Sequence, residues 1–162
     1  MITNFAHLAG YPLLYEKAVF AEDLLVDGKD REHSLQAMSA MRGVLDLMMK
    51  ELVRMCGMTD AMVLSYAPPG KADERVNLFT RIEALAKSGR IPQDSAGRLH
   101  EMRTLGNRAV HGEESVNRMD SGTAFRTAEG MYALLYEETY RFVYEYASGG
   151  GFVNYGGGGF GF

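Results

Sequence analysis

The segment 31–56 carries the pattern that most restricts the fold of this chain. Its apolar side chains recur at steps of three and four residues, which is the period of an α-helix with one buried face. These side chains are Leu35, Met38, Leu45, Met49, Leu52 and Cys56. Gly57 follows at a position where helices commonly stop. A long helix of this kind needs other helices to cover its apolar side, so we expect a helical bundle.

Four further segments repeat the helical period, namely 12–26, 72–88, 92–111 and 123–147. A shorter stretch, 59–70, ends in the loop sequence Ala-Pro-Pro-Gly. No segment sustains the alternation of apolar and polar residues that is typical of strands. The sequence therefore predicts an all-α fold, an antiparallel bundle of about five helices joined by short links.

The composition divides the chain into a helical domain, residues 1–147, and a glycine-rich tail, residues 148–162. A chain of 162 residues with 46% hydrophobic residues suits one folded domain. The tail contains eight glycines, four aromatic residues and no charge, so we expect it to be flexible. Its aromatic side chains could contact a partner or nucleic-acid bases, although a tail without a role is the favoured interpretation.

Several classes of protein are excluded by simple counts. Cys56 is the single cysteine, which excludes an internal disulfide and a cysteine-based zinc cluster. No apolar stretch approaches the roughly 18 residues of a membrane span, and the first residues lack the features of a signal peptide. No phosphate-binding loop of the Gly-x-x-x-x-Gly-Lys-Ser/Thr type is present. We expect a cytoplasmic protein that uses no cofactor, no metal and no membrane.

The charge is distributed unevenly along the chain. The whole sequence has 17 Lys and Arg against 21 Asp and Glu, a net charge of -4. The segment 71–111 reverses this balance, with eight basic and five acidic residues. A basic pair of helices on an acidic body suits an anionic partner. On charge alone, a solvated face with incidental ion pairs is the favoured explanation.

A sharper signal lies in the segment 99–112, LHEMRTLGNRAVHG. On a helix Leu99, Met102, Leu105, Gly106, Ala109 and Val110 face the bundle. The polar residues His100, Arg103, Asn107 and His111 share a neighbouring arc of about 80°, while Arg108 points away. A guanidinium, an amide and imidazoles are the groups that hold a phosphate and transfer a proton near neutral pH. The alternative is structural, with Asn107 and His111 satisfying buried backbone groups and the helix end.

Two other positions support a polar site beside the core. Gly106 stands inside the predicted helix, where glycine costs about 1 kcal/mol relative to alanine, and this indicates the close approach of another backbone. Arg42 interrupts the apolar stripe of the segment 31–56, where an unpaired cation is costly. We expect it to pair with Asp46, one helical turn further on.

These residues together resemble a known family. The chain has Ala21-Glu22 in an opening helix, then Ser34-Leu35 followed by Arg42 and Asp46. A helix ending in Gly-x-Ile-Pro at 89–92 precedes Arg-x-x-Gly-Asn-x-Ala-Val-His-Gly at 103–112. The order resembles the bacterial domain-of-unknown-function family 4145, over roughly residues 5–147. That family is found at the N-terminus of type I restriction-enzyme R subunits and helicase-like proteins, and it is similar to the HEPN superfamily of α-helical bundles.

The resemblance implies a HEPN-like fold and a set of site residues. HEPN ribonucleases are metal-independent, are usually dimeric, and place an Arg, a polar residue and a His at a composite site between two protomers. Asn107 and His111 match the polar residue and the histidine. Gly106 stands where the catalytic arginine is expected, and Arg103 lies one turn earlier on nearly the same face.

Two functions follow from this resemblance. The first is a non-catalytic HEPN-like module that binds nucleic acid, RNA rather than DNA, or a protein partner in a restriction or anti-phage system, as a homodimer. The second is a metal-independent endoribonuclease in which Arg103 holds the phosphate, His111 is the general acid and base, and Asn107 orients it.

In either case we expect His100, Arg42 and Arg108 to contribute to substrate binding. Gly106, Gly112 and Asp46 would serve the structure of the motif. A third interpretation is a structural adaptor whose tail, residues 148–162, recruits a partner. The departure at Gly106 and the net acidic charge favour the non-catalytic module.

Overall fold

The structure, a computed structural model, describes residues 3–68, 75–112 and 118–148. These residues form α-helices, a short 3-10 helix and a final π-helical turn, and they contain no strand. The all-α prediction is confirmed. The elements in chain order are η1 (Ala6–Leu8), α1 (Pro12–Asp27), α2 (Arg31–Met55), α3 (Asp60–Ser65), α4 (Leu78–Lys87), α5 (Gln93–His111), α7 (Ser121–Arg141) and η2 (Phe142–Tyr146).

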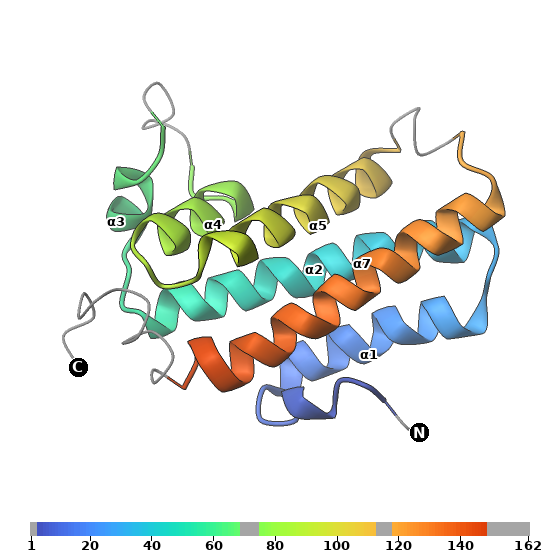
Figure 1. Ribbon diagram of the computed structural model, residues 1–162, viewed down its shortest axis with the longest axis horizontal. Coiled ribbons are helices and arrows are strands. Elements are labelled where there is room, and N and C mark those ends of the chain that lie inside the picture. The colour runs from blue at the N-terminus through green and yellow to red at the C-terminus, as the bar shows by residue number, and fades with distance from the viewer. Residues whose placement is uncertain (1–2, 69–74, 113–117, 149–162) are drawn as a thin grey trace.

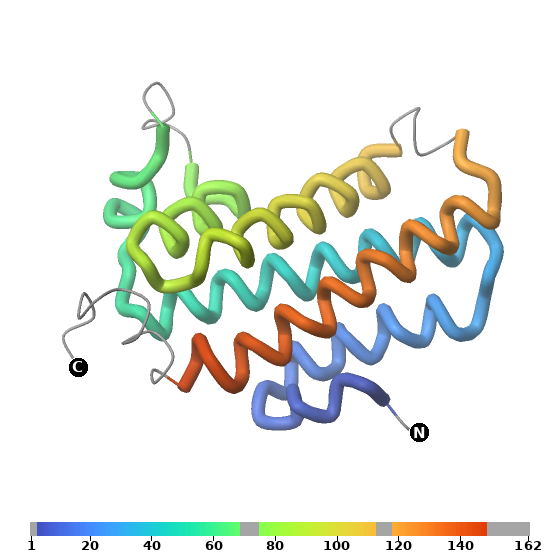
Figure 2. Tube along the Cα trace, in the orientation of Figure 1, coloured from blue at the N-terminus to red at the C-terminus, as the bar shows by residue number. Residues whose placement is uncertain are grey.

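The four long helices run antiparallel to their chain neighbours and form the body of the molecule (Figure 1). Helix α2 lies in the middle and contacts α1, α5 and α7. The short helices α3 and α4 cover one end of the bundle, beside the C-terminal half of α2 (Figure 2). The central place of α2 agrees with its sequence, because its buried residues include Met38, Met41, Leu45, Met48, Met49 and Leu52, all fully inaccessible to solvent.

Side-chain caps and glycines set the ends of the helices. Asp30 and Asp120 accept hydrogen bonds from backbone amides in the first turns of α2 and α7. Gly57, Gly89 and Gly112 all have positive φ angles, and they stand after α2, α4 and α5, where the left-handed conformation ends a helix.

Helix α4 starts later than the predicted segment 72–88. Asn77 and Thr80 form a reciprocal capping box, in which each side chain binds the backbone amide of the other. This pair fixes the start of α4 at Leu78, a boundary that apolar periodicity alone does not mark. A second difference is α3, a short helix of six residues within the segment 59–70.

The predicted last helix, 123–147, is present but changes its form near the end. Helix α7 runs to Arg141 and continues as the π-helical turn η2. Of the predicted tail, the structure describes Ser148, and residues 149–162 lie outside the described part. No helix among the described residues is long and apolar enough to cross a membrane.

Candidate functional site

Helix α5 presents its predicted apolar face to the bundle over most of its length. Leu99, Met102 and Gly106 are buried, and Leu105 and Ala109 are half-buried. The prediction is wrong for Val110, whose side chain is 51% exposed. Val110 borders a surface pocket of about 360 Å³ that also contacts α2, so the last turn of α5 is not covered by the core.

Arg42 and Asn107 join α2 to α5 across this face. The Nε atom of Arg42 donates a hydrogen bond of 2.5 Å to Oδ1 of Asn107. Gly106 makes the contact sterically feasible, because a Cβ atom placed there would lie 2.4 Å from Cβ of Arg42. The sequence signal at Gly106 is therefore real, and the atoms nearest to such a Cβ are Cβ, Cγ and Cδ of Arg42.

Arg42 does not form the predicted pair with Asp46. The Asp46 carboxylate binds Nζ of Lys50 at 3.0 Å and NH1 of Arg81 at 3.4 Å. The Arg42 side chain instead extends toward α5, where it binds Asn107. The role expected of Asp46 thus changes: it connects α2 to α4 through Arg81.

Arg103 and His100 extend the polar contact between α2 and α5 toward α4. We call the line formed by Arg42, Asn107, Arg103 and His100 the seam. Nε2 of His100 lies 2.8 Å from Glu83 of α4, and Nε of Arg103 donates to Nδ1 of His100 at 3.3 Å. The guanidinium of Arg103 also lies over the ring of Phe79, 5.2 Å from its centroid. These contacts hold Arg103 and His100 together, as the helical spacing predicted.

The seam concentrates positive charge between α2 and α5. Burial and the nearby charge of Arg42 lower the pKa of Arg103, although Glu83 opposes this effect. Burial disfavours the ionised form of Glu83, but its hydrogen bond with His100 and the charges of His100 and Lys87 lower its pKa overall. Within the described part of the chain, neither Arg42 nor Arg103 makes a salt bridge to a carboxylate. The pair is thus suited to a bound anion.

The C-terminal end of α5 carries the remaining predicted residues. His111 is the last residue of the helix and is exposed, and its side chain makes no hydrogen bond to any residue in the described ranges. Arg108 is exposed on the side away from the seam, in the direction expected for it. Gly112 ends the helix with φ 59°, and its amide donates to the carbonyl of Arg108. His111 is not brought into contact with Arg103 within one chain.

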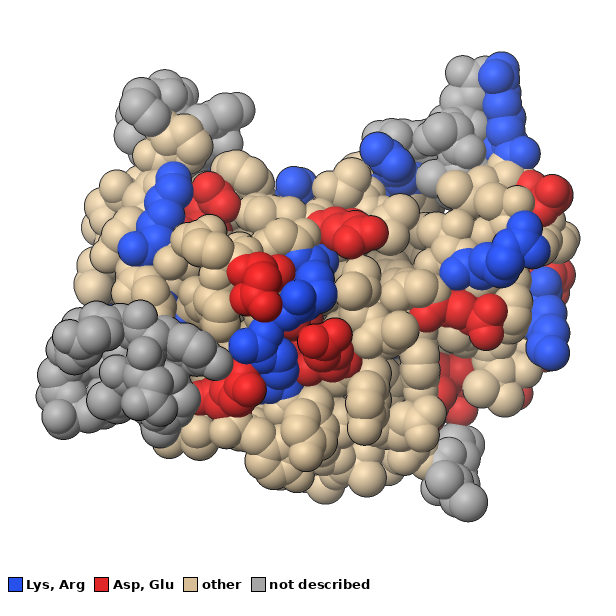
Figure 3. Space-filling view, in the orientation of Figure 1, with Lys and Arg blue, Asp and Glu red and all other residues tan. Residues whose placement is uncertain are grey.

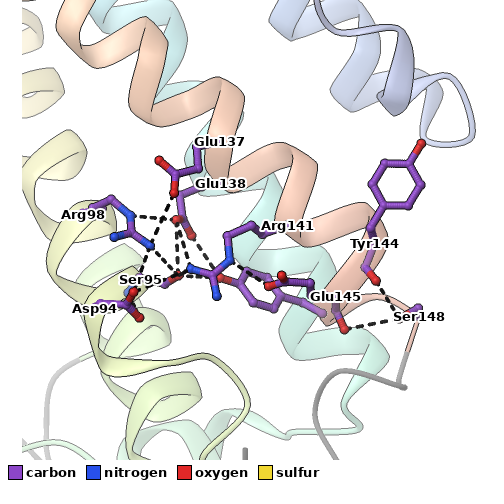
Figure 4. A network of polar contacts seen from close by, with 10 residues as sticks. Asp94, Ser95, Arg98, Glu137, Glu138, Arg141, Tyr144, Glu145 and Ser148 are labelled. Carbon is purple, nitrogen blue, oxygen red and sulfur yellow. Dashed lines mark hydrogen bonds and ion pairs between the residues drawn. The ribbon is translucent and has the colours of Figure 1, made fainter. Parts of the chain in front are cut away.

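A second polar cluster, between α5 and α7, was missed by sequence reasoning (Figure 4). Glu138 is completely buried and accepts hydrogen bonds from Arg98 Nε at 3.0 Å and Ser95 Oγ at 3.2 Å. The hydroxyl of Tyr146 lies 2.5 Å from Ser95 Oγ, and Arg141 donates to the same oxygen at 2.7 Å. Glu138 occupies a core position of α7, and this interruption of an apolar stripe is the signal that could have revealed the cluster.

A third cluster joins the N-terminal segment, α1 and α7. Glu22 is almost completely buried, and its Oε2 atom accepts a 2.6 Å hydrogen bond from the hydroxyl of Tyr132. The side chain of Asn4 donates to that hydroxyl at 2.8 Å. Burial, together with the bond to Glu22, raises the pKa of Tyr132 to about 12. These groups satisfy one another and tie the N-terminal segment to the bundle.

Metal binding finds no support in the described ranges. No group of three or more His, Cys, Asp or Glu side chains there could hold a metal ion. Cys56 is half-buried, and burial raises the pKa of its thiol, so it lacks the character of a reactive thiolate.

Comparison with known proteins gives one match. Residues 29–147 match the model of a family described as Domain of unknown function (DUF4145). The match spans the helices that carry the Arg42–Arg103 seam and the Glu138 cluster. No curated protein and no solved structure matches the chain.

Proposed function

The chain belongs to the DUF4145 family, and from its site we propose that it is a HEPN-like module that binds single-stranded nucleic acid without cleaving it. The observation that carries the proposal is the nearness of Arg42 and Arg103 at the α2–α5 seam, where neither forms a salt bridge with a described carboxylate. Their side chains contact an amide and an imidazole, and burial together with the charge of Arg42 lowers the pKa of Arg103, although Glu83 opposes this. A phosphate would relieve this repulsion and accept hydrogen bonds from both guanidinium groups.

The preference for single-stranded RNA over duplex DNA rests on the surroundings of Arg103. Phe79 and His100 have ring centroids 5.2 Å apart, and Arg103 covers the same phenyl ring. Planar groups next to a phosphate site favour unpaired bases, which stack on aromatic rings and guanidinium planes. Single-stranded RNA supplies such bases more readily than duplex DNA does.

The position of His111 supports a binding function over catalysis. An acid–base histidine must lie within hydrogen-bond reach of the reacting group. His111 stands eight residues after Arg103 on the same helix, about 12 Å along its axis. A ribonuclease would need a second chain to bring these two side chains to one phosphate, and the family resemblance supplies that alternative. We also propose that the module acts in the cytoplasm, in the restriction or anti-phage context that the family resemblance suggests.

Fluorescence anisotropy with a labelled single-stranded RNA tests the proposed binding. We expect Arg42→Gln and Arg103→Gln to raise the dissociation constant at least about tenfold each, the effect of losing one charge-assisted phosphate contact. Arg126→Gln removes the same charge from an exposed position on α7 and serves as the matched control. Equal weakening by all three variants would show non-specific attraction and contradict a site at the seam.

A cleavage assay separates the binding module from the ribonuclease. The same RNA is incubated with wild type and with His111→Ala in EDTA, at matched oligomeric state. The proposal predicts intact RNA in both reactions. Cleavage by wild type that disappears in the variant would establish the ribonuclease instead.

A further inference from the structure

A pocket of about 650 Å³ lies beside the last turns of α1 and the first half of α7. Figure 1 shows the end of α1 and the start of α7 at the same end of the bundle. The N-terminal segment borders the pocket at Asn4. The pocket shares no residue with the Arg42–Arg103 seam. Its main lining residues are Glu22, Asp23, Leu25, Phe125, Glu129 and Tyr132.

The pocket is acidic. Within the described ranges it is lined by the carboxylates of Glu22, Asp23 and Glu129, against the single ammonium group of Lys29. None of these four side chains forms a salt bridge with a described residue. Three carboxylates around one recess produce a local negative potential, which attracts a cation.

Glu22 is the carboxylate for which a cation matters most, because it is only 6% exposed. Its Oε2 atom accepts hydrogen bonds from the hydroxyl of Tyr132 at 2.6 Å and from the backbone amide of Asn4 at 3.2 Å. These bonds bring no positive charge, and no described residue donates to Oε1. A buried carboxylate is costly without an opposite charge, which Arg98 provides for Glu138. For Glu22, a cation in the adjoining pocket would provide it.

The aromatic wall of the pocket already contacts an alkylammonium group. Nζ of Lys29 lies 5.7 Å from the centroid of the Phe125 ring, within the range of a cation–π contact. Lys29 is exposed and follows the end of α1, so a bound ligand can replace it at the ring. Its side chain shows which chemistry the wall accepts, namely a positive group on an aliphatic stem.

We propose that this pocket binds a small aliphatic polyamine, a chain of methylene groups that carries two or more ammonium groups. One ammonium group would replace that of Lys29 over Phe125, and another would neutralise Glu22. The methylene groups would cover the apolar lining at Leu25. This site is additional to the proposed nucleic-acid binding and does not depend on it, because the two sites share no residue.

The lining favours a polyamine over other cations. A hydrated Mg²⁺ ion keeps several waters and gains nothing from aromatic and apolar walls. A lysine or arginine side chain of another protein would bring one charge to a recess with three unpaired carboxylates. The volume of the pocket is also within the range of small-molecule sites. A flexible ligand with several ammonium groups satisfies both the charge and the apolar surface.

Isothermal titration calorimetry of the full chain, freed of nucleic acid, tests the site. The probes are spermidine, diaminobutane and butylamine, which carry successively fewer positive charges. We expect the affinity to fall in that order, and Mg²⁺ at the same concentration not to displace spermidine. Displacement by Mg²⁺ would show general attraction to an acidic chain and overturn the proposal. A short peptide with one lysine that binds as tightly as spermidine would overturn the assignment to a free polyamine.

Glutamine variants locate the charges that hold the ligand. Glu22→Gln keeps an oxygen that accepts from Tyr132 but removes the buried charge, so the dissociation constant for spermidine should rise at least about tenfold. Glu129→Gln changes an exposed residue of the pocket and should raise it about threefold. Glu137→Gln removes a mostly exposed charge from the same helix outside the pocket and should leave it unchanged. Equal weakening by all three variants would contradict a site in this pocket.

Lys29→Gln provides a test of opposite sign. Without the internal ammonium group the Phe125 ring is open to the ligand, so spermidine should bind at least about threefold more tightly. Lys17→Gln removes the same charge from an exposed position of α1 outside the pocket and should leave the affinity unchanged. Phe125→Leu keeps an apolar side chain and should weaken binding about fivefold.

Weaker binding by Lys29→Gln, or unchanged binding by Phe125→Leu, would overturn the proposal. Circular dichroism confirms that each variant is folded, and the exposed positions Lys29 and Glu129 keep the test available if Glu22→Gln does not fold. RNA anisotropy with Glu129→Gln should match wild type, which keeps a failure here separate from the seam.

Discussion

Helix α5 carries two arginines, Arg98 and Arg103, that lie in different electrostatic environments. Arg98 binds the buried carboxylate of Glu138 and lies 3.4 Å from Asp94 and 3.9 Å from Glu137. Arg103 lies only five residues further along, yet its hydrogen-bond partner is an imidazole, and burial and the charge of Arg42 lower its pKa while Glu83 opposes them. The same residue type on one helix thus forms salt bridges with carboxylates in one place and none with a described carboxylate in the other.

The difference separates a structural cluster from the proposed binding site. At the Glu138 cluster, acidic and basic side chains alternate in a band across the exposed face over α5 and α7 (Figure 3). Charges arranged in this way neutralise one another and join the two helices. At the Arg42–Arg103 seam neither half-buried arginine forms a salt bridge with a described carboxylate, although the charge of Glu83 acts on Arg103, and a bound anion would accept hydrogen bonds from both guanidinium groups.

The largest expected effect comes from removing Glu138. Glu138→Ala leaves Arg98 and the hydroxyls of Ser95 and Tyr146 without their shared acceptor, so we expect the free energy of unfolding to fall by about 3 kcal/mol. Urea unfolding followed by circular dichroism measures the change. Glu137→Ala is the control. The Glu137 carboxylate is mostly exposed and lies 3.9 Å from Arg98, farther than the 3.0 Å between Arg98 and Glu138. Equal losses in the two variants would show that burial of the network adds nothing.

Gly106 offers a test of the seam through packing. Gly106→Ala places a methyl group against the Arg42 side chain, and we expect a loss of about 1–3 kcal/mol in the free energy of unfolding, as for other overpacked sites.

Gly97 is the matched control for this substitution. It lies on α5 with nothing within 4 Å of a Cβ atom, so Gly97→Ala should raise the free energy of unfolding by about 0.5–1 kcal/mol. Opposite signs at the two glycines, read from thermal or urea unfolding, would locate the constraint at Arg42. A gain at both positions would mean that the Arg42–Asn107 contact is not maintained in solution.

The sequence predicted the bundle well because buried apolar positions recur with the helical period. Met38, Leu45, Met49 and Leu52 of the α2 stripe are buried as expected, as are Leu99 and Met102 of α5. Leu35 and Cys56, at the two ends of the stripe, are half-buried. Boundaries set by side-chain hydrogen bonds were less visible, as the capping box of Asn77 and Thr80 shows.

The candidate site was predictable only where its residues share one helix. The spacing of His100 and Arg103 indicated their contact, and both side chains do meet. The partner of Arg42 depends on how α2 packs against α5, so a local pairing with Asp46 was the natural but wrong inference. Glu138 was missed for the same reason, because its four partners come from two helices and a π-helical turn.

The dependence of stability on pH should differ in sign between the two clusters. Burial, although opposed by Arg98 and Ser95, raises the pKa of Glu138 in the folded chain, so its contribution to stability is complete below the unfolded value and is lost as the pH rises through the folded one. The pKa of Glu83 is lowered despite burial, by its bond with His100 and the nearby Lys87. Its contribution is present above the unfolded value and is lost as the pH falls through the folded one.

Glutamine variants isolate these two contributions. Between about pH 4 and 7, the stability of Glu138→Gln relative to wild type should increase as the pH rises, because the variant lacks the charge whose burial weakens wild type. Glu83→Gln should show the reverse, with its stability falling relative to wild type over the same interval. Unfolding free energies measured at several pH values check both slopes, and slopes of the same sign would contradict the contrast between the clusters.

The smallest effect on stability is expected at Arg103, a residue of the proposed binding site. Arg103→Gln removes a cation that repels Arg42 and loses one 3.3 Å hydrogen bond and the contact with Phe79. These gains and losses are each about 0.5–1 kcal/mol, so the free energy of unfolding should change by less than about 1 kcal/mol. Arg98→Gln, which leaves the buried Glu138 without its closest cation, should cost at least about 2 kcal/mol. If urea unfolding shows equal losses of unfolding free energy for the two variants, Arg103 is a structural residue like Arg98. The positive charge of the seam would then already be compensated within the fold.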